Sequence, residues 1–188
     1  NNEFRVGLTP NSCKTILDEG HTVYIQANAG LGIGFTNDHY LDSGALVLDT
    51  AEEIYLIAEL IIKVKEPIES EYKYLRDDLT LFTYLHLAGD PVNAKKLIDT
   101  GVTGIAYETV TAEDGSMPLL APMSAIAGQI SIVVGSYHLL KHNLGKGVLI
   151  GSFGDIAPRV VTVIGGGVAG KEAISKSIAN NAFVKVID

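Results

Sequence analysis

Cysteine and positive charge are both scarce in this chain of 188 residues. Its single cysteine, Cys13, excludes an internal disulfide and a thiolate metal cage, which fits a reducing cytoplasm. The 14 Lys and Arg residues are outnumbered by 22 Asp and Glu residues, giving a formal net charge of −8. This balance argues against a general nucleic-acid or anionic-membrane binder, so any basic site has to be local.

The chain also lacks an obvious membrane span and a cleavable signal. Its longest uncharged stretch, residues 115–140, is long enough to cross a bilayer, but it contains Pro118, Gln129 and His138, which are costly in lipid. Residues 1–5 show no basic stretch followed by an apolar one. With 47% hydrophobic and 19% charged residues, the chain can bury a core. We therefore expect a cytoplasmic protein without a membrane partner, and we interpret residues 115–140 as forming a buried helix.

Short apolar runs alternate with capped helices along the chain. Thr9-Pro10 is a typical helix start and Gly20 a typical helix end, and this first helix carries Cys13 on its apolar face. We expect strands over residues 22–26, 45–49, 60–65, 79–86, 102–107, 160–164 and 184–187, with helices between them. This alternation predicts an α/β fold with a mainly parallel, Rossmann-like sheet.

The helix expected over Ser124–Lys141 has two different lines of side chains. Its apolar line is Ile126, Ile130, Val133, Tyr137 and Leu140, and its line of small residues is Ser124, Gly128, Ser131 and Gly135. The small residues permit another element to approach the helix backbone closely. We expect this helix to pack on two neighbours, so that it links a domain over residues 1–120 to one over residues 121–188, or forms a subunit contact.

A glycine-rich turn, residues 165–170, satisfies the pattern G-x-G-x-x-G between the strand 160–164 and a helix. Gly165 permits the tight turn, Gly167 lets the backbone approach a pyrophosphate, and Gly170 lets the helix lie close to the strand. Asp188 ends the next strand, 18 residues after Gly170, where its carboxylate can accept from the ribose hydroxyls and would repel a 2′-phosphate. The pattern therefore predicts a dinucleotide site that prefers NAD to NADP.

We expect three further polar residues at the carboxyl edge of the sheet, where parallel sheets bind their ligands. Lys65 and His86 each end a predicted strand, and Arg5 comes just before the first helix. Arginine can hold a carboxylate, lysine can polarise a carbonyl, and histidine can exchange a proton near neutral pH. These tasks suit a 2-oxo or 2-amino acid. Lys63 shares a strand face with Lys65, and periodicity alone leaves the choice between them open.

The chain ends after one strand–helix–strand unit of the dinucleotide domain, which normally needs two such halves. We therefore expect the chain to be part of a larger enzyme. The 188-residue chain alone should be inactive, because a cofactor anchored at one end cannot hold the geometry that hydride transfer needs. We expect no metal site, since His138 and His142 have helical ligand spacing but no third ligand beside them.

Six strings, in this order and spacing, make the chain resemble the bacterial alanine dehydrogenase family. They are NNEFRVGLTP (1–10), KVKEP (63–67), FTYLHLA (82–88), GIAYETV (104–110), LLAPMSAIAGQ (119–129) and VIGGGVAG (163–170). The resemblance runs from residue 1 to residue 188, without the family's opening strand and roughly its later half. Because substrate and cofactor strings agree independently, the match is specific.

The resemblance implies an oxidoreductase that reversibly deaminates L-alanine to pyruvate and ammonium with NAD, in L-alanine catabolism. It also implies a cytoplasmic homo-oligomer, usually a hexamer. In the family's pattern, Arg5 binds the substrate carboxylate, Lys65 contacts the substrate and His86 is the acid/base. The cofactor-contacting positions are Ser124, Gly165, Gly167, Val168, Ala169 and Gly170, with Asp188 on the ribose. A second catalytic acid of the family has no counterpart in this chain.

Two other interpretations stay open at this stage. The nucleotide-binding domain of proton-translocating NAD(P) transhydrogenase shares the architecture, but its pattern lacks the pairing of Lys65 with His86. Alternatively, the chain is a non-catalytic module that at most oligomerises. Alanine-dependent NADH formation would separate the first alternative from alanine dehydrogenase, and calorimetry with NADH would test the second.

Overall fold

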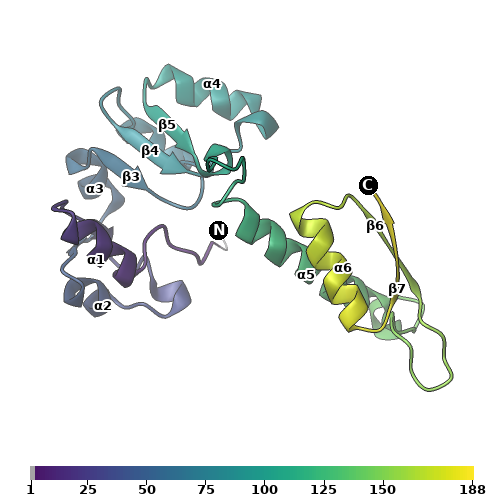
Figure 1. The fold of residues 1–188 in the computed structure, drawn as a ribbon. Coiled ribbons are helices and arrows are strands. Elements are labelled where there is room, and N and C mark those ends of the chain that lie inside the picture. The colour runs from purple at the N-terminus through teal and green to yellow at the C-terminus, as the bar shows by residue number, and fades with distance from the viewer. Residues whose placement is uncertain (1–2) are drawn as a thin grey trace. The chain divides into compact units, whose positions relative to one another are not determined.

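The structure is a computed structural model that describes residues 3–188, and the chain divides into two compact units between Thr109 and Val110 (Figure 1). Every pair of neighbouring strands in the sheets of these units is parallel, which confirms the predicted α/β class. The division precedes the boundary expected between residues 120 and 121, because the segment 110–120 groups with the helix that follows it. Each unit is described below by itself.

The first part of the N-terminal unit combines a two-stranded sheet with two short helices. Its elements are α1 (Pro10–Asp18), β1 (Tyr24–Gln26), η1 (Leu31–Ile33), α2 (Asn37–Asp42) and β2 (Leu46–Leu48), and β1 pairs with β2. α1 begins as predicted, because the Thr9 hydroxyl accepts from the Ser12 N–H at 3.2 Å and Pro10 is the first helical residue. Cys13 is fully buried, and burial raises the pKa of its thiol. Its expected packing role is therefore confirmed.

The second part of this unit is a three-stranded sheet in the order β3-β4-β5. The strands are β3 (Leu60–Ile62), β4 (Thr80–Thr83) and β5 (Thr103–Ala106), and the connecting elements are α3 (Ala51–Ile57), η2 (Glu69–Tyr74), η3 (Leu87–Gly89), α4 (Pro91–Asp99) and η4 (Tyr107–Thr109). β3 and β4 are shorter than predicted. Lys65 and His86 therefore lie in the loops that follow these strands, not within them. For His86 the reason is its left-handed backbone, φ 51°, which an extended strand does not accommodate.

A core of apolar side chains fixes β4 at the centre of this sheet. Leu79 and Leu81 are fully buried, and they pack in one cluster with Tyr55, Ile61, Leu75, Leu85 and Leu97. Fully burying a leucine side chain is worth about 1.5–3 kcal/mol. The cluster continues to Leu85, the residue before His86, so the loop that carries His86 begins from a well-packed support.

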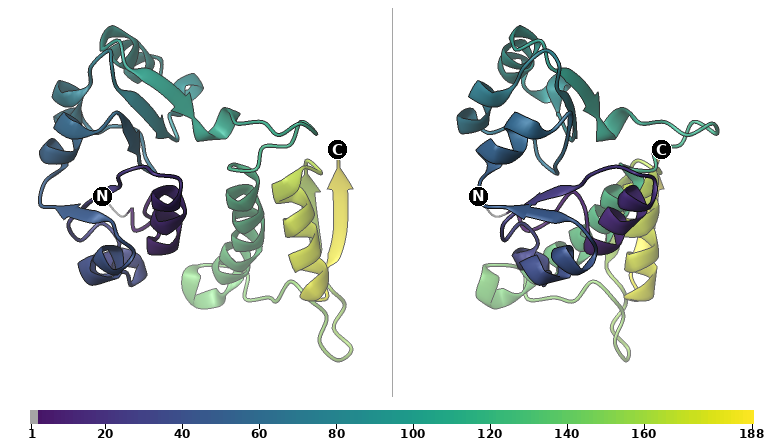
Figure 2. Two further views of the ribbon diagram at one scale, coloured as in Figure 1. Left: turned by 60° about the vertical axis from the view of Figure 1, so that its left-hand side comes forward. Right: turned by 90° about the vertical axis from the view of Figure 1, so that its left-hand side faces the viewer.

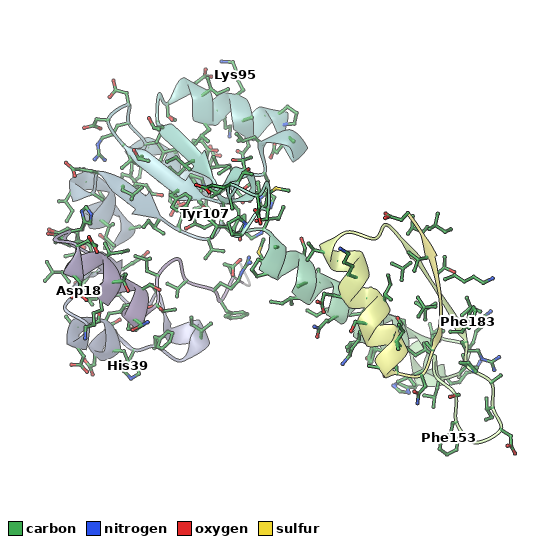
Figure 3. All side chains as sticks on the ribbon, in the orientation of Figure 1. Asp18, His39, Lys95, Tyr107, Phe153 and Phe183 are labelled. Atoms are coloured by element: carbon green, nitrogen blue, oxygen red, sulfur yellow. The ribbon has the colours of Figure 1, made fainter. Side chains whose placement is uncertain are left out.

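The C-terminal unit is one strand–helix–strand motif with a long helix against it. Its elements are α5 (Ala121–Leu139), η5 (Lys141–Asn143), β6 (Val160–Ile164), α6 (Val168–Ala179) and β7 (Phe183–Ile187). β6 pairs with β7 in parallel, and α6 connects them. Figure 2 shows α5 and α6 side by side, in agreement with the contacts between them. Phe153, labelled in Figure 3, is 73% exposed in the long segment between η5 and β6.

Small residues allow α5 and α6 to touch through their backbones, as predicted. Gly128 is buried in α5, and a Cβ atom placed on it would lie 2.1 Å from the carbonyl oxygen of Ala169 and 2.9 Å from Cβ of Glu172. A Cβ atom on Gly135, further along the same line of small residues, would meet nothing within 4 Å. The close approach is therefore made at Gly128, next to the first turn of α6.

The expected burial of the 115–140 helix is wrong for most of its length. Within α5 only Gly128 and Ile132 are buried. The apolar line is largely exposed, with exposed fractions of 59% at Ile126 and 54% at Tyr137. The helix is apolar on nearly all sides, and the elements packed against it, α6 and at Ile132 also β6, leave most of those sides uncovered. None of the described helices, α5 included, is long and apolar enough to cross a membrane.

Candidate active site

His86 follows β4 in a tight loop with an unusual backbone. Its φ of 51° and ψ of 31° lie in the left-handed region, where few residues other than glycine are found. The His86 carbonyl accepts from the Gly89 N–H at 3.0 Å, which closes the loop. The imidazole is 53% exposed, and its Nδ1 lies 3.5 Å from Oε2 of Glu66. A half-exposed imidazole beside a carboxylate is suited to exchanging protons with a bound molecule.

Glu108, in η4 directly after β5, accepts hydrogen bonds from the backbone of the same loop. Its Oε1 accepts from the His86 N–H at 2.7 Å and from the Leu85 N–H at 3.2 Å, and its Oε2 lies 3.3 Å from the Leu85 nitrogen. The sequence analysis gave this residue no role. One signal could have found it, since Glu108 follows β5 just as His86 follows β4, at the edge where parallel sheets bind their ligands.

Lys65 follows β3 on the other side of β4. The buried Thr83 hydroxyl donates to the Lys65 carbonyl at 2.8 Å, which fastens the two strand ends together. Lys65 lines a cleft of about 430 Å³ that Glu66, Tyr72 and Asn93 also line. Lys63, the alternative that periodicity left open, instead donates to Glu71 in a half-buried ion pair. The structure therefore gives the two lysines different surroundings, with Lys65 at a cleft and Lys63 neutralised.

Arg5 lies in the segment before α1 and holds a carboxylate of its own chain. Its Nε and Nη2 donate to the two oxygens of Glu3 at 2.8 and 2.7 Å. These hydrogen bonds, with a further contribution from the ammonium of Lys65, lower the pKa of the Glu3 carboxyl to about 2. Arg5 in turn interacts electrostatically with Tyr84. The ring of Tyr84 lies 6.1 Å from that of His86, between ring centres.

These interactions bring the three predicted substrate residues into one region of the N-terminal unit. Glu3 is near both Arg5 and Lys65, and Tyr84 is near both Arg5 and His86. The ring of Tyr107, labelled in Figure 3, packs edge-on against that of Tyr84 with ring centres 4.9 Å apart. Burial raises the pKa of Tyr107 to about 12, so its hydroxyl stays protonated at neutral pH. The region combines two cations with a proton carrier, which can bind and transform a small carboxylate.

The glycine turn of the C-terminal unit has the steric features that a dinucleotide requires. Gly165 has a φ of 96°, and a Cβ atom on Gly170 would lie 1.9 Å from the Gly165 carbonyl oxygen. Cβ atoms on Gly165 or Gly167 would meet nothing within 4 Å, so the outer side of the turn is open. Val168 and Ala169 begin α6, and the first N–H groups of a helix have no partner within the helix and can bind an anion. These residues therefore fit a pyrophosphate group.

Asp188 and Ser124 lie in the same unit as the glycine turn. The Asp188 carboxylate accepts from the Gly166 N–H at 2.7 Å, so it lies directly beside the turn, just after β7. Ser124 is in the first turn of α5, where its N–H donates to the Leu120 carbonyl at 3.2 Å. The predicted cofactor residues are thus all in the C-terminal unit, and the predicted substrate residues are all in the N-terminal one.

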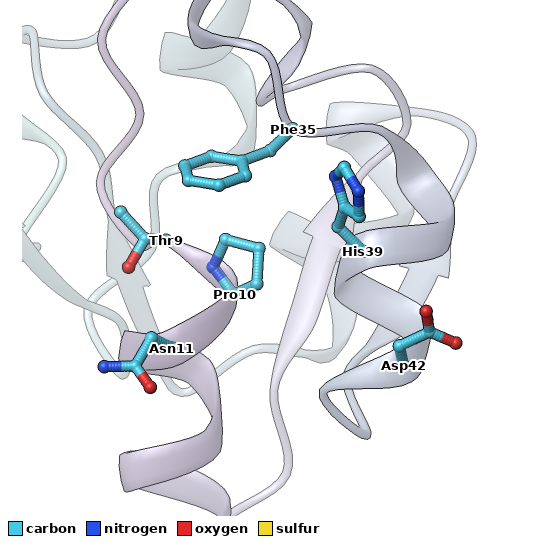
Figure 4. Close-up of a pocket in the computed structure, with 6 residues that line it drawn as sticks. All are labelled: Thr9, Pro10, Asn11, Phe35, His39 and Asp42. Carbon is cyan, nitrogen blue, oxygen red and sulfur yellow. The ribbon is translucent and has the colours of Figure 1, made fainter.

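Another pocket in the N-terminal unit contains none of the predicted site residues. It is an open, largely apolar hollow of about 360 Å³ between α1 and α2, and Figure 4 shows Phe35 and His39 on one side of it and Thr9 and Pro10 on the other. No group of three or more possible metal ligands occurs among the residues that the structure describes. His138 and His142 instead lie edge-on to Tyr137.

Sequence comparison also divides the chain into an N-terminal and a C-terminal domain, although its boundary lies within α5 and not before it. The sequence model of "Alanine dehydrogenase/PNT, N-terminal domain" matches residues 1–127, and that of "Alanine dehydrogenase/PNT, C-terminal domain" matches residues 131–188. The chain belongs to the alanine dehydrogenase/PNT family. This membership confirms the resemblance noted from the sequence strings, and it agrees with the parallel sheets of both units.

Individual members of the family match over the whole chain. It is 46% identical over 188 residues to the alanine dehydrogenase of Methanococcus maripaludis, and it covers 50% of that protein. A solved L-alanine dehydrogenase superposes with a TM-score of 0.90 at 43% identity, covering all of this chain and 52% of the other. A transhydrogenase from Sinorhizobium meliloti shares the fold, with a TM-score of 0.79 at 24% identity over 98% of this chain and 53% of the other. The chain thus spans about half the length of these relatives.

Proposed function

We propose that this chain forms the substrate half and part of the cofactor half of an NAD-dependent alanine dehydrogenase. The reaction is L-alanine + NAD⁺ + H₂O ⇌ pyruvate + NH₄⁺ + NADH + H⁺. We further propose that the protein is a cytoplasmic homo-oligomer, a hexamer as in the family, that acts in L-alanine catabolism. Alanine and pyruvate are small carboxylates, in keeping with a site whose cations come from a few local residues of an acidic chain.

The observation that carries this proposal is that the Arg5 guanidinium binds both oxygens of a carboxylate, that of Glu3. The Glu3 carboxylate is also stabilised by the Lys65 ammonium. A substrate carboxylate would bring the same charge to these cations, and the planar guanidinium matches its two oxygens. Arg5 would then orient the substrate, while Lys65 would stabilise the oxygen that develops at the former amino-bearing carbon.

His86 would hold and move the proton in this scheme. Its imidazole is half exposed, at the edge of the same sheet as Lys65, and its Nδ1 lies 3.5 Å from Oε2 of Glu66. In the direction of deamination, His86 would take the proton from the water that attacks the substrate carbon. In the reverse direction it would return that proton.

A nicotinamide dinucleotide fits the glycine turn and would supply the hydride acceptor when bound. Gly165, Gly167 and Gly170 would let the backbone approach the pyrophosphate, with Val168 and Ala169 presenting helix N–H groups to it. Ser124 and Asp188 would contact the rest of the cofactor, with Asp188 on the ribose. A carboxylate at this place repels a 2′-phosphate, so we propose NAD as the cofactor.

The test is alanine-dependent NADH formation by the protein at its natural length. We expect Lys65→Met and His86→Asn each to lower turnover by roughly 10²–10⁴-fold, the range that positioned acid–base groups contribute. NADH affinity should stay within about twofold, because neither residue is in the unit that carries the glycine turn. Lys63→Met is the control two residues before Lys65, since Lys63 pairs with Glu71 and does not line the cleft, and the folded variant should retain turnover.

Three results would contradict the proposal. The first is a wild-type protein that binds NADH but shows no alanine-dependent turnover. The second is wild-type turnover in Lys65→Met or His86→Asn. The third is hydride exchange between two nucleotides without any need for alanine, which would favour the transhydrogenase alternative.

A further inference from the structure

We propose that Glu108 is the positioning residue for His86, acting through the backbone of the His86 loop and not through the imidazole. This inference rests on the proposed function for its catalytic part, since it takes His86 to be the proton carrier. Its structural part stands on the hydrogen bonds alone. Neither the sequence strings nor the proposed mechanism gave Glu108 a task.

The backbone of His86 needs an external support. A residue with a side chain in the left-handed region carries a local conformational cost of about 1–3 kcal/mol and persists only where its surroundings over-determine it. At His86 the carbonyl side is fixed by the Gly89 N–H at 3.0 Å. The N–H side is fixed by Glu108 Oε1 at 2.7 Å, the shorter of the two contacts.

The Glu108 carboxylate is well placed to do this for two consecutive peptides. Its Oε1 receives the N–H groups of both Leu85 and His86, and charge-assisted bonds of this kind are about twice as strong as neutral ones. Leu85 is only 5% exposed, so its N–H would lose a partner in a place with little water to replace it. The carboxylate therefore joins the carboxyl end of β5 to the loop after β4.

The geometry also separates the contribution of the charge from that of the hydrogen bond. Oε1 alone receives the His86 N–H and the shorter of the two contacts from Leu85, while Oε2 is 3.3 Å from the Leu85 nitrogen. A glutamine with its carbonyl oxygen in the place of Oε1 would keep both main contacts. Glu108→Gln should therefore preserve the loop, whereas Glu108→Ala should release it.

The first experiment measures how fast the His86 backbone amide exchanges with solvent in the 188-residue chain. With ¹⁵N-labelled histidine, the five histidines give five backbone amide signals, and His86→Asn assigns the one that matters. We expect the His86 amide to exchange with solvent slowly in the wild type, close to that rate in Glu108→Gln, and at least about tenfold faster in Glu108→Ala. Glu59, an exposed glutamate of the same unit, provides the matched controls Glu59→Gln and Glu59→Ala, which should leave the rate unchanged.

The second experiment measures catalysis in the protein at its natural length. In Glu108→Ala we expect kcat for alanine to fall roughly 10–100-fold, the effect of a displaced proton carrier, with the KM for alanine and the affinity for NADH within about threefold of wild type. Glu108→Gln should recover most of kcat. A role limited to stability would lower the amount of folded enzyme and leave the kcat of the folded fraction unchanged.

The outcomes are distinguishable from those that test the proposed function. A His86 amide that exchanges freely in the wild type, or as slowly in Glu108→Ala as in the wild type, overturns the positioning role, whatever the enzyme does. Equal loss of kcat in Glu108→Gln and Glu108→Ala overturns it as well, because the hydrogen-bond acceptor would then not be what matters. If wild-type protein shows no alanine turnover, the proposed function fails, while the exchange rates still decide whether Glu108 holds the loop.

Discussion

Replacing Gly128 by alanine should weaken the contact between α5 and α6 and lower the stability of the C-terminal unit. The added Cβ would lie 2.1 Å from the Ala169 carbonyl oxygen, a backbone atom that can move only if α6 moves. Overpacking of this kind costs about 1–3 kcal/mol, and the upper end applies because no flexible side chain can yield. Alanine also favours a helix over glycine by roughly 0.5–1 kcal/mol, which leaves a net loss of about 2 kcal/mol.

Gly135→Ala is the control, because it places the same substitution in the same helix where nothing lies within 4 Å. It should stabilise the unit by roughly 0.5–1 kcal/mol through helix propensity alone. For a domain of 60–100 residues, 1 kcal/mol corresponds to about 4–8 °C in Tm. Thermal unfolding followed by circular dichroism should therefore place the Gly128→Ala transition of this unit about 10 °C below the wild type and the Gly135→Ala transition above it.

A second readout connects this contact to the cofactor turn. Ala169 belongs to the first turn of α6, so a displaced α6 should also reduce NADH affinity in the protein at its natural length. Gly135→Ala should leave that affinity unchanged. If Gly128→Ala proved as stable as Gly135→Ala, the reasoning from close backbone approach would be refuted. Unchanged NADH binding in a clearly destabilised Gly128→Ala would refute only its extension to the cofactor turn.

Three further predictions concern charge and capping. The pKa of Glu3 is depressed, so its contribution to stability is complete above about pH 4.5 and is lost as the pH falls toward about 2. Because Arg5 is half exposed, we expect this contribution to the free energy of unfolding to be roughly 0.5–1 kcal/mol. Acid unfolding curves of Glu3→Gln should lack this part of the pH dependence. Asp188→Ala should narrow the preference for NAD over NADP in the protein at its natural length, and a wild type that used both equally would contradict the proposed ribose contact. Thr9→Ala should lower the free energy of unfolding by about 1 kcal/mol, because it removes the acceptor for the Ser12 N–H. Urea unfolding would detect this loss. Thr15→Ala should lower it less, because the Thr15 hydroxyl only donates to a carbonyl within α1.

The sequence predicted best the features that depend on neighbouring residues. The Thr9 cap, the Pro10 start and the glycine turn at 165–170 all follow from local backbone rules, and the structure has each of them. The small-residue line of α5 also predicted the close approach at Gly128. These features need no knowledge of distant parts of the chain, because a cap, a tight turn or a small side chain acts where it occurs.

Features that depend on partners far along the chain could not be predicted in the same way. The Glu108 carboxylate accepts from the His86 N–H across 22 positions, and although both residues follow strands of one sheet, no local pattern predicts that hydrogen bond. The exposure of Ile126 and Tyr137 depends on which elements cover α5, a property that helical periodicity does not contain. The ion pair between Lys63 and Glu71, eight positions apart, is likewise a tertiary contact that strand periodicity does not contain.

The left-handed backbone at His86 also limits how the site could be altered by protein engineering or by mutation over time. Glycine adopts this conformation freely, asparagine and aspartate share histidine's enhanced tolerance for it, and β-branched residues are the least tolerant. Of these, only histidine carries a group that exchanges protons near neutral pH. A library randomised at residue 86 should therefore return folded variants enriched in asparagine, aspartate and glycine. The backbone conformation, and not the reaction, would then limit which side chains can replace histidine at this position.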